Sequence, residues 1–515
     1  MAGDDAVIET VPAAVDAAAH KYAGHVAIAE QAGPVLTYAE LREQVRRVAG
    51  ALIANGIEAG DRVAIWSPNT HHWVLAGLGA LYAGATLVPV NTRYTGHEAL
   101  DVITRTKSRA LFVAGPFLGA DRLANLAQAA GEAGLPELIV RIPVESPEPS
   151  WGEFLEHAAS EEHLDARAAA VRPDHVSDIL FTSGTTGRSK GAMSAHRQAL
   201  GVARAWADCA ELSSTDRYLI VNPFFHSFGY KAGILACLLT GAAMVPQLVF
   251  DAGAAIRLIE EQRITVFPGA PTLYVSILDH PDKNSHDLSS LRVAVTGAAV
   301  VPVALVERMR AELSFGTVLT AYGLTEAVVA TMCRPGDDAE TIATTSGRAA
   351  AGFEVKIAGS ERTGEILLRG PNVMLGYLDD EAATAEAIDA DGWLHTGDVG
   401  HLNERGYLTI TDRLKDMYIC GGFNVYPAEI EQALARHEAV AESVVIGVPD
   451  DRLGEVGKAF IVLRQGTEAT PGEVREFCKQ RLANFKVPRY VEFRTELPRN
   501  PAGKPLKRVL REEST

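Results

Sequence analysis

The clearest chemical signal in this sequence is a short segment, residues 182–191, which reads Thr-Ser-Gly-Thr-Thr-Gly-Arg-Ser-Lys-Gly. Glycines let backbone N–H groups come close to an anion, and short hydroxyl side chains add further hydrogen-bond donors. A flexible Gly/Ser linker is the alternative, but linkers seldom follow a buried strand as closely as this segment follows residues 178–181. We interpret the segment as a phosphate-binding loop made by Thr182, Ser183, Gly184, Thr185, Thr186, Gly187 and Lys190.

The spacing of this loop excludes the P-loop of nucleoside triphosphatases. That motif needs four residues between two glycines, followed by Lys and then Ser or Thr. Counting from Gly184, Ser189 stands where the second glycine is required and Gly191 stands where the Ser or Thr is required. Since a strand is expected at 178–181, the loop would leave the carboxyl end of a sheet, where open α/β sheets bind ligands.

Length and composition indicate a globular protein of more than one domain. A chain of 515 residues is too long for one ordinary core. Hydrophobic residues at 47% and charged residues at 22% are typical of globular proteins. The formal net charge of −17 resides in the first part of the chain, because residues 413–515 carry about +2. This acidic balance argues against general nucleic-acid binding.

Three features bear on location. Asp4 and Asp5 stand where a signal peptide needs basic residues, and no apolar run reaches about 18 residues. The five cysteines are odd in number and show no metal-ligand spacing, so we expect reduced thiols. The sequence therefore predicts a cytoplasmic protein without an integral membrane segment. A homo-oligomer is compatible with the sequence.

The elements that must position the loop alternate between helix and strand patterns. Residues 38–55 place Leu41, Val45, Val48 and Leu52 on one face at helical spacing. Helix-like segments separate short β-branched runs at 63–66, 87–90, 218–221, 264–267 and 292–295. This βαβ alternation favours an α/β body of two doubly wound sheets.

The pattern of expected helices and strands changes twice further along the chain. From about residue 352 strand and turn patterns dominate, which predicts a β-rich subdomain. After the charged stretch 412–416, helix patterns at 428–436 and 470–482 alternate with strand patterns at 441–447 and 458–463. We predict a body at 1–412, a hinge at 413–416 and a mobile α+β C-terminal domain at 417–515.

Seven motifs in this chain occur in the order found in acyl-adenylate-forming enzymes, the superfamily of acyl-CoA synthetases, firefly luciferase and nonribosomal adenylation domains. They begin at residues 182, 223, 321, 395, 412, 421 and 498. The resemblance implies a two-step reaction that uses ATP, Mg²⁺ and coenzyme A: an acid and ATP give acyl-AMP and pyrophosphate, and then a thiol displaces AMP. Only eleven residues follow Lys504, so free CoA is the expected thiol.

The resemblance also assigns catalytic roles. Lys504, within Pro-Arg-Asn-Pro-Ala-Gly-Lys, resembles the family's catalytic lysine. It would offset the repulsion between the attacking carboxylate and the α-phosphate. Glu326 and Thr325 would hold the metal and the α-phosphate, with Thr185 as a second metal contact. His226 would be a gate beside the carboxylate pocket, although a lone histidine among aromatics is more often a core residue.

The nucleotide would be bound by residues of three further motifs. By resemblance, Tyr322 lies against the adenine, while Asp398 accepts hydrogen bonds from both ribose hydroxyls with support from Arg413. Gly297 and Gly323 complete the expected ATP site. For Asp398, an ordinary turn-capping role is the alternative.

The two half-reactions need different surroundings for the same acyl-adenylate. The resemblance implies that the C-terminal domain rotates about Lys415. This rotation would withdraw Lys504 and bring in Gly421 and Gly422 to line the pantetheine tunnel. Without side chains, these glycines would leave space for a thin thiol arm.

The acid is less well specified. Nearness to the motifs suggests a pocket built from Phe228, Tyr230, Lys231, Gly269, Ala270, Gly297 and Ala298. Segments beginning at residues 67, 178, 228 and 416 resemble an actinobacterial branch whose ligases attach CoA to the indane propanoate left when steroid rings A and B are removed. We therefore expect a bicyclic steroid-derived propanoate. The alternatives are a medium-chain fatty acid or aryl acid and, outside enzymes, an inactive acyl-adenylate-binding homologue.

Overall fold

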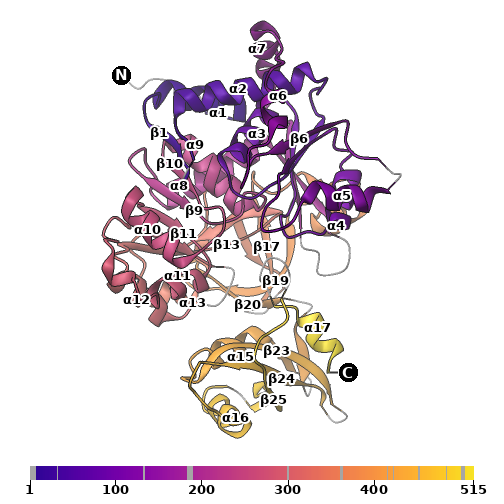
Figure 1. Cartoon of the computed structure of the whole chain (residues 1–515). Coiled ribbons are helices and arrows are strands. Elements are labelled where there is room, and N and C mark those ends of the chain that lie inside the picture. Colours follow the sequence, from indigo (N-terminus) through magenta and orange to yellow (C-terminus); the bar gives the residue numbers. More distant parts are fainter. Residues whose placement is uncertain are drawn as a thin grey trace.

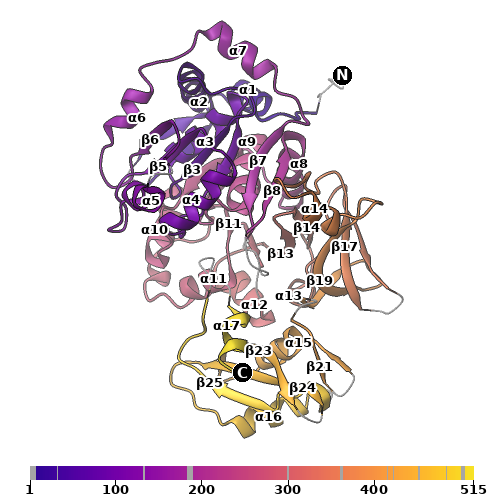
Figure 2. The same ribbon diagram turned by 90° about the vertical axis from the view of Figure 1, so that its right-hand side faces the viewer.

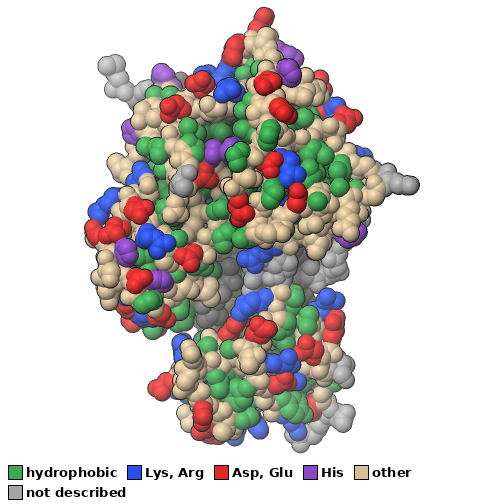
Figure 3. All heavy atoms as spheres, in the orientation of Figure 1, with side chains coloured by type: hydrophobic (Ala, Val, Ile, Leu, Met, Phe, Trp, Pro, Cys, Tyr) green, Lys and Arg blue, Asp and Glu red, His purple; other side chains and the backbone are tan. Residues whose placement is uncertain are grey.

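The computed structural model describes residues 7–31, 33–131, 134–182, 189–297, 301–359, 363–413, 416–420, 423–450, 453–482, 484–499 and 505–514. A large body carries both major sheets, and a smaller C-terminal domain lies against one end of it (Figures 1 and 2). Acidic and basic side chains intermix over the face seen in Figure 3.

The first large sheet is parallel except at one edge, where β7, β8 and β18 are antiparallel. Its strand order is β18 (Gly376–Tyr377), β8 (Gly191–Ala195), β7 (Val176–Phe181), β4 (Thr86–Pro89), β3 (Arg62–Trp66), β5 (Ala110–Ala114) and β6 (Leu138–Ile142).

The second large sheet is parallel from β13 to β1 and antiparallel at both edges. Its strand order is β15 (Arg348–Ala349), β14 (Ala327–Met332), β13 (Thr317–Leu324), β12 (Val293–Thr296), β11 (Val266–Pro268), β9 (Arg217–Ile220), β10 (Ala243–Pro246), β1 (Val26–Ala29) and β2 (Val35–Thr37).

Helices cover these sheets (Figure 2). The helices of the body are α1 (Val11–Lys21), α2 (Tyr38–Ala54), α3 (His71–Tyr82), α4 (Gly96–Arg105), α5 (Arg122–Ala130), α6 (Pro149–Phe154), α7 (Glu161–Ala169), α8 (His196–Cys209), the π-helix η2 (Phe228–Leu235), α9 (Ala236–Thr240), α10 (Ala252–Gln262), α11 (Pro271–Leu278), the short η3 (Lys283–Ser285), α12 (Val303–Glu312), α13 (Ala339–Thr344) and α14 (Glu381–Ala387).

Local sequence explains the clearest of these elements. The predicted helix at 38–55 is confirmed as α2, where a capping box joins Thr37 and Glu40 and the apolar stripe is buried. Along β3, Val63 and Ile65 belong to the main core, whereas Ala64 and Trp66 belong to a second core beneath α4 and α5. Because successive residues of a strand point to opposite faces, both faces of this sheet are covered.

Two smaller sheets follow. The β-rich subdomain holds β16 (Glu354–Ile357), β17 (Gly364–Arg369), β19 (Leu394–Leu402) and β20 (Leu408–Arg413). The C-terminal domain holds β22 (Phe423–Val425), β21 (Tyr418–Cys420), β24 (Gly454–Leu463), β23 (Val440–Asp450) and β25 (Tyr490–Phe493), with α15 (Pro427–Leu434), α16 (Pro471–Lys479), the short η4 (Asn484–Lys486) and α17 (Lys507–Glu512).

The predicted fold class is therefore confirmed: two doubly wound sheets, a β-rich subdomain and a small α+β C-terminal domain. The buried residues of the C-terminal core all lie between Tyr418 and Leu510. The exact domain limits at 412 and 417 stay predictions.

Candidate active site

Four parallel strands of the second large sheet end at the same edge, because β9, β11, β12 and β13 run in register beside one another. The segments that follow β9, β11 and β12 contain Asn222 to His226, Gly269 and Gly297, and Gly323 lies near the carboxyl end of β13. Carboxyl ends of parallel strands are the usual ligand-binding edge of such sheets. The sheet thus brings together predicted residues that are about 100 positions apart in the chain.

Glycine is required at two of these positions because the backbone is crowded. A Cβ atom on Gly297 would lie 3.0 Å from the carbonyl oxygen of Ala321, and one on Gly323 would lie 2.4 Å from the backbone nitrogen of Val329. Their places in the ATP site remain predictions, but the close packing of β12 and the β13–β14 hairpin explains why neither carries a side chain.

The predicted adenine and ribose residues contact each other. The hydroxyl of Tyr322 donates a hydrogen bond of 2.6 Å to Oδ2 of Asp398, and both side chains are buried. Asp398 stands opposite Arg413 in the β19–β20 pairing. Gly397, within β19, has a φ of 69°. The backbone N–H of Asp398 donates to the hydroxyl of Thr396 at 3.1 Å. The side chain of Arg413 lies outside the described residues.

The residues that the sequence predicts to hold the metal and the α-phosphate form the tip of a hairpin. Leu324 pairs with Ala327, so Thr325 and Glu326 make the turn between β13 and β14. The carboxylate of Glu326 accepts a hydrogen bond of 2.7 Å from the hydroxyl of Tyr377, and burial together with this carboxylate raises the pKa of Tyr377. Tyr377 is a site residue that the sequence analysis missed, because a tyrosine in the apolar run 375–378 carries no signal of its own.

This arrangement fits a magnesium ion held jointly with ATP. Mg²⁺ is usually bound by one or two carboxylates and the substrate phosphates rather than by a cage of protein ligands. In the described part of the chain, no group of three or more His, Cys, Asp and Glu side chains could hold a metal. Glu326 accepts the hydrogen bond of Tyr377 at Oε1, so Oε2 would be the oxygen that binds the cation.

The predicted phosphate-binding loop joins β7 to β8, and the structure describes its two ends. The N–H of Thr182 donates to the carbonyl of Lys190 at 2.9 Å. Arg105 on α4 donates to the carbonyl of Ser189 at 2.7 Å and was also missed by the sequence analysis. The strand predicted at 178–181 is confirmed as part of β7. The expected phosphate contacts Ser183, Gly184, Thr185, Thr186 and Gly187 lie outside the described residues.

The segment after β9 is held by a buried asparagine. Asn69 accepts a hydrogen bond from the N–H of Phe224 at 2.8 Å and donates to the carbonyl of Asn222 at 3.0 Å. His226 lies just beyond, with Nδ1 accepting from the N–H of Phe228 at 3.1 Å. His226 is exposed, and desolvation by nearby protein atoms lowers the pKa of its ring.

The expected acyl-pocket residues lie on and around the π-helix η2. The ring of Phe228 packs edge-on against Trp206, with centroids 4.8 Å apart. Tyr230 is buried. Lys231 is 1% exposed, and its Nζ lies 2.9 Å from Oδ1 of Asp178 and 2.7 Å from Oγ of Ser194. In this conformation both contacts of the Lys231 ammonium are to protein groups, and its place in the acyl pocket stays a prediction.

Other acyl-pocket and C-terminal predictions are only partly covered. Gly269 is buried after β11, while Ala298 lies outside the described residues. Four further predicted residues also lie outside the described residues: Lys415 of the hinge, Gly421 and Gly422 of the tunnel, and the catalytic candidate Lys504.

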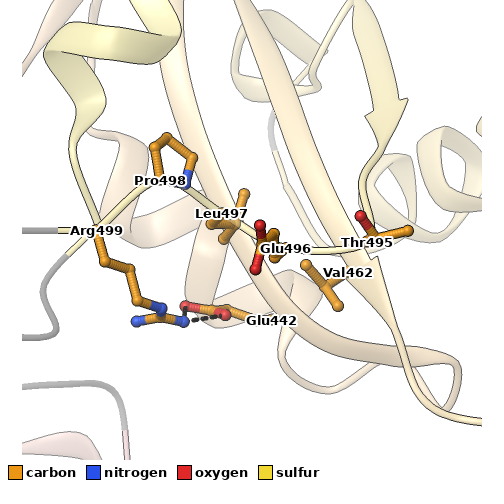
Figure 4. Close-up of a pocket in the computed structure, with 7 residues that line it drawn as sticks. All are labelled: Glu442, Val462, Thr495, Glu496, Leu497, Pro498 and Arg499. Atoms are coloured by element: carbon orange, nitrogen blue, oxygen red, sulfur yellow. Dashed lines mark hydrogen bonds and ion pairs between the residues drawn. The ribbon is translucent and has the colours of Figure 1, made fainter. Parts of the chain in front are cut away.

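The structure does describe the base of the segment that carries Lys504. Arg499 and Pro505 form an antiparallel bridge, and the N–H of Leu506 donates to the carbonyl of Pro498 at 2.8 Å. Beside this base lies a hollow of about 400 Å³. Among the residues that line it, Arg499 points to the carboxylate of Glu442 (Figure 4). The hollow is lined by Glu442, Val462, Thr495, Glu496, Leu497, Pro498 and Arg499.

Comparison with known proteins defines the class. Residues 15–378 match the family described as AMP-binding enzyme, and residues 429–504 match the AMP-binding enzyme C-terminal domain. The chain therefore belongs to the AMP-binding enzyme family. It is an AMP-forming acid–CoA ligase, with ATP, Mg²⁺, CoA and a small carboxylic acid as the reacting set.

Three relatives are particularly similar. The chain is 60% identical over 513 residues to a ligase of Rhodococcus jostii, covering 98% of each, and 59% identical over 510 residues to one of Mycobacterium tuberculosis, covering 98% of this chain and 99% of the relative. Both are named as CoA ligases for a 7a-methyl-1,5-dioxo-octahydroindenyl propanoate. The crystal structure of ATP-bound MatB from Rhodopseudomonas palustris superposes with a TM-score of 0.87 at 30% identity, covering 98% of this chain and 99% of that chain.

Within the described residues, no helix combines the length and the apolar character needed to cross a membrane.

Proposed function

We propose that this enzyme attaches CoA to a bicyclic propanoate derived from the C and D rings of a steroid. The observation that carries the proposal is the 60% and 59% identity, over nearly the whole chain, to two ligases named for such an acid. The sequence alone had favoured the same acid. A medium-chain or aryl acid is the second candidate, because a feruloyl-CoA synthase of Amycolatopsis is 37% identical over 495 residues.

The first half-reaction joins two anions. An oxygen of the propanoate attacks the α-phosphorus of ATP, the bond to the β-phosphate oxygen breaks, and pyrophosphate leaves. In the proposed site Tyr322 and Asp398 hold the nucleoside, while Thr325 and the phosphate loop hold the phosphates. Bound Mg²⁺ would supply positive charge to the phosphate oxygens at Glu326. Lys504 would stabilise the approaching carboxylate and the phosphate together.

The second half-reaction breaks the anhydride. The CoA sulfur attacks the carbonyl carbon of the acyl-adenylate, the thiol proton is released, and AMP leaves with the bonding electrons. We propose that rotation at Lys415 removes Lys504 before this step and brings Gly421 and Gly422 beside the pantetheine arm. The second family match ends at residue 504, which supports treating Lys504 as part of the C-terminal domain.

A coupled AMP-release assay with ATP, Mg²⁺ and CoA tests the substrate. The panel should hold the bicyclic dioxo propanoate, straight-chain acids of C6 to C12 and ferulate. We expect kcat/KM for the bicyclic acid to exceed that for every other acid by at least about tenfold, the scale on which a shaped pocket discriminates. A higher kcat/KM for ferulate or a straight chain would overturn the proposed acid. No AMP release with any acid would favour the inactive homologue.

We further propose that the enzyme works in the cytoplasm and that it forms a homo-oligomer. The location is supported by the five cysteines Cys209, Cys237, Cys333, Cys420 and Cys478, which are buried free thiols, as expected in a reducing compartment. Light scattering of the purified protein would test the oligomer, and a single monomer mass would contradict it.

A further inference from the structure

A short segment, residues 374–378, links two parts of the site and is named here the strap. At one end, the N–H of Met374 donates to the carbonyl of Glu326 at 2.8 Å. At the other end, the N–H of Leu378 donates at 2.8 Å to the carbonyl of Gly191, the last residue of the predicted phosphate-binding loop and the first of β8. Between them, β18 pairs with β8. The strap therefore fixes the metal hairpin and the exit of the phosphate loop relative to each other.

One side chain of the strap contacts both charged groups. The hydroxyl of Tyr377 donates to Oε1 of Glu326 at 2.7 Å, and the ammonium of Lys190 lies 4.9 Å from the centre of the Tyr377 ring. Lys190 comes from the phosphate loop and Glu326 from the β13–β14 turn. The phenol thus contacts an anion through its hydroxyl and a cation through its ring.

We propose that Tyr377 is a positioning residue for the ATP–metal site: its hydroxyl orients the Glu326 carboxylate toward the metal, and its ring seats Lys190 on the phosphate side. A hydrogen bond to one carboxylate oxygen restricts rotation of the group and leaves the other oxygen for a cation. The ring face attracts the ammonium without neutralising it. Both charges are then held apart for a nucleotide. This inference rests on the metal role proposed above for Glu326.

The backbone around Tyr377 shows that its place is well determined. Its N–H donates to the hydroxyl of Thr384 at 2.9 Å. Gly376 has a φ of 143°, and a Cβ atom there would lie 2.8 Å from Cγ2 of Thr384. A glycine before Tyr377 thus lets the strap pass close to α14. Because the ring position is fixed by the backbone, the hydroxyl and the ring face can be tested separately.

The experiment measures equilibrium binding and requires no turnover. Electron paramagnetic resonance follows Mn²⁺ binding in the presence of a non-hydrolysable ATP analogue, and calorimetry follows binding of the same analogue without metal. The variants are Tyr377→Phe, which keeps the ring, Tyr377→Leu, which removes ring and hydroxyl, and Glu326→Gln. Tyr407→Phe is the matched control, because Tyr407 donates a bond of the same length, 2.7 Å, to a carboxylate of Asp337.

We expect Tyr377→Phe to weaken Mn²⁺ affinity about tenfold, the scale of a hydrogen bond to a charged group, with metal-free analogue binding unchanged. Tyr377→Leu should also weaken metal-free binding about threefold, because Lys190 loses its ring contact. Tyr407→Phe should change neither. Wild-type Mn²⁺ affinity in Tyr377→Phe, or an equal loss in Tyr407→Phe, would overturn the inference. If both Tyr377→Phe and Glu326→Gln bind Mn²⁺ with wild-type affinity, the metal role of Glu326 is wrong as well. If only Tyr377→Phe keeps wild-type affinity, the metal role of Glu326 stands and the role of Tyr377 is overturned.

Discussion

The body and the C-terminal domain hold their proposed site residues in different ways. In the body, Tyr322 and Asp398 are joined by a buried hydrogen bond between two sheets, and Glu326 is fixed by Tyr377. In the C-terminal domain, the segment leading to Lys504 is described only at its base, through the Arg499–Pro505 bridge and the ion pair to Glu442. That domain also has its own core.

This difference suggests a division of work. A preformed site in the body can bind nucleotide in both half-reactions, since ATP and acyl-AMP share the adenosine part. A domain with a separate core can change its position without unpacking the body. Changes in the body should therefore affect both half-reactions, and changes in the C-terminal domain should separate them.

Lys504→Ala should produce the largest difference between the effects on the two half-reaction rates. Loss of a charge that stabilises the attacking carboxylate and the phosphate should slow acyl-AMP formation by about two to three orders of magnitude. Thioester formation from supplied acyl-adenylate should be spared. Pyrophosphate exchange measures the first half-reaction, and single-turnover thioester formation measures the second. Similar losses in both would argue against the role given to Lys504.

Lys415→Pro should have the opposite effect and slow the second half-reaction more than the first. Proline fixes φ, so it should hinder rotation and slow thioester formation about tenfold, with a smaller effect on adenylation. Lys415→Ala keeps the backbone free and serves as the control. Unchanged rates of both half-reactions in Lys415→Pro would refute the hinge.

A change in the body should not separate the half-reactions. Asp398→Asn keeps the shape but removes the charge that would accept bonds from the ribose, so ATP affinity should fall about tenfold. The affinity for supplied acyl-adenylate should fall by a similar factor. Titrations with both ligands check this, with Tyr322→Phe as the milder companion variant. A loss confined to one ligand would contradict a shared nucleoside site.

A small effect is expected for Glu442→Gln at the base of the Lys504 segment. The Glu442–Arg499 pair is solvent-exposed, with side chains 33% and 41% accessible, and such pairs contribute about 0–1 kcal/mol. Adenylation should slow by no more than about threefold, with thioester formation unaffected. A loss of adenylation rate as large as that of Lys504→Ala would contradict this expectation and show that the exposed Glu442–Arg499 pair is needed to position the segment.

The smallest effect on catalysis at neutral pH, but a clear one on stability, is expected for His72→Phe on α3. Burial and the neighbouring His71 lower the pKa of His72 from 6.5 to about 3. The unfolded chain therefore takes up a proton below pH 6.5 that the folded body resists. The part of the free energy of unfolding that depends on neutral His72 is fully present above pH 6.5. It decreases as the pH falls toward 3, and about 2 kcal/mol of it is lost by pH 5.

The variant should lose less stability than the wild type between pH 7 and pH 5. Urea unfolding followed by tryptophan fluorescence reports on the body alone, because all five tryptophans precede residue 412. Equal acid destabilisation of both proteins would show that His72 is not the titrating group.

Local patterns allowed much of the fold to be predicted. The stripe of Leu41, Val45, Val48 and Leu52 and the buried run at 178–181 depend on neighbours in sequence, and both elements form as expected. The alternation of such elements also predicted two doubly wound sheets, and in the second of them Gly269 and Gly297 follow neighbouring strands.

What could not be predicted depends on distant partners. Lys231 was expected at the acyl pocket from its nearness to a motif, yet Asp178, 53 residues earlier, holds it in a buried ion pair. Tyr377 meets Glu326 across 51 residues through the strap. Neither pairing leaves a periodic pattern, because it depends on strand register between segments that are far apart.

The most direct test of the division of work is to measure both half-reaction rates side by side in Lys504→Ala and Asp398→Asn at subsaturating ligand. The ratio of adenylation to thioester formation should fall at least about a hundredfold in the first variant, as expected for loss of a charge stabiliser, and stay within about threefold of wild type in the second. A ratio that changes equally in both variants, or in neither, would contradict this account, in which the body binds the nucleotide and the C-terminal domain supplies Lys504 for adenylation.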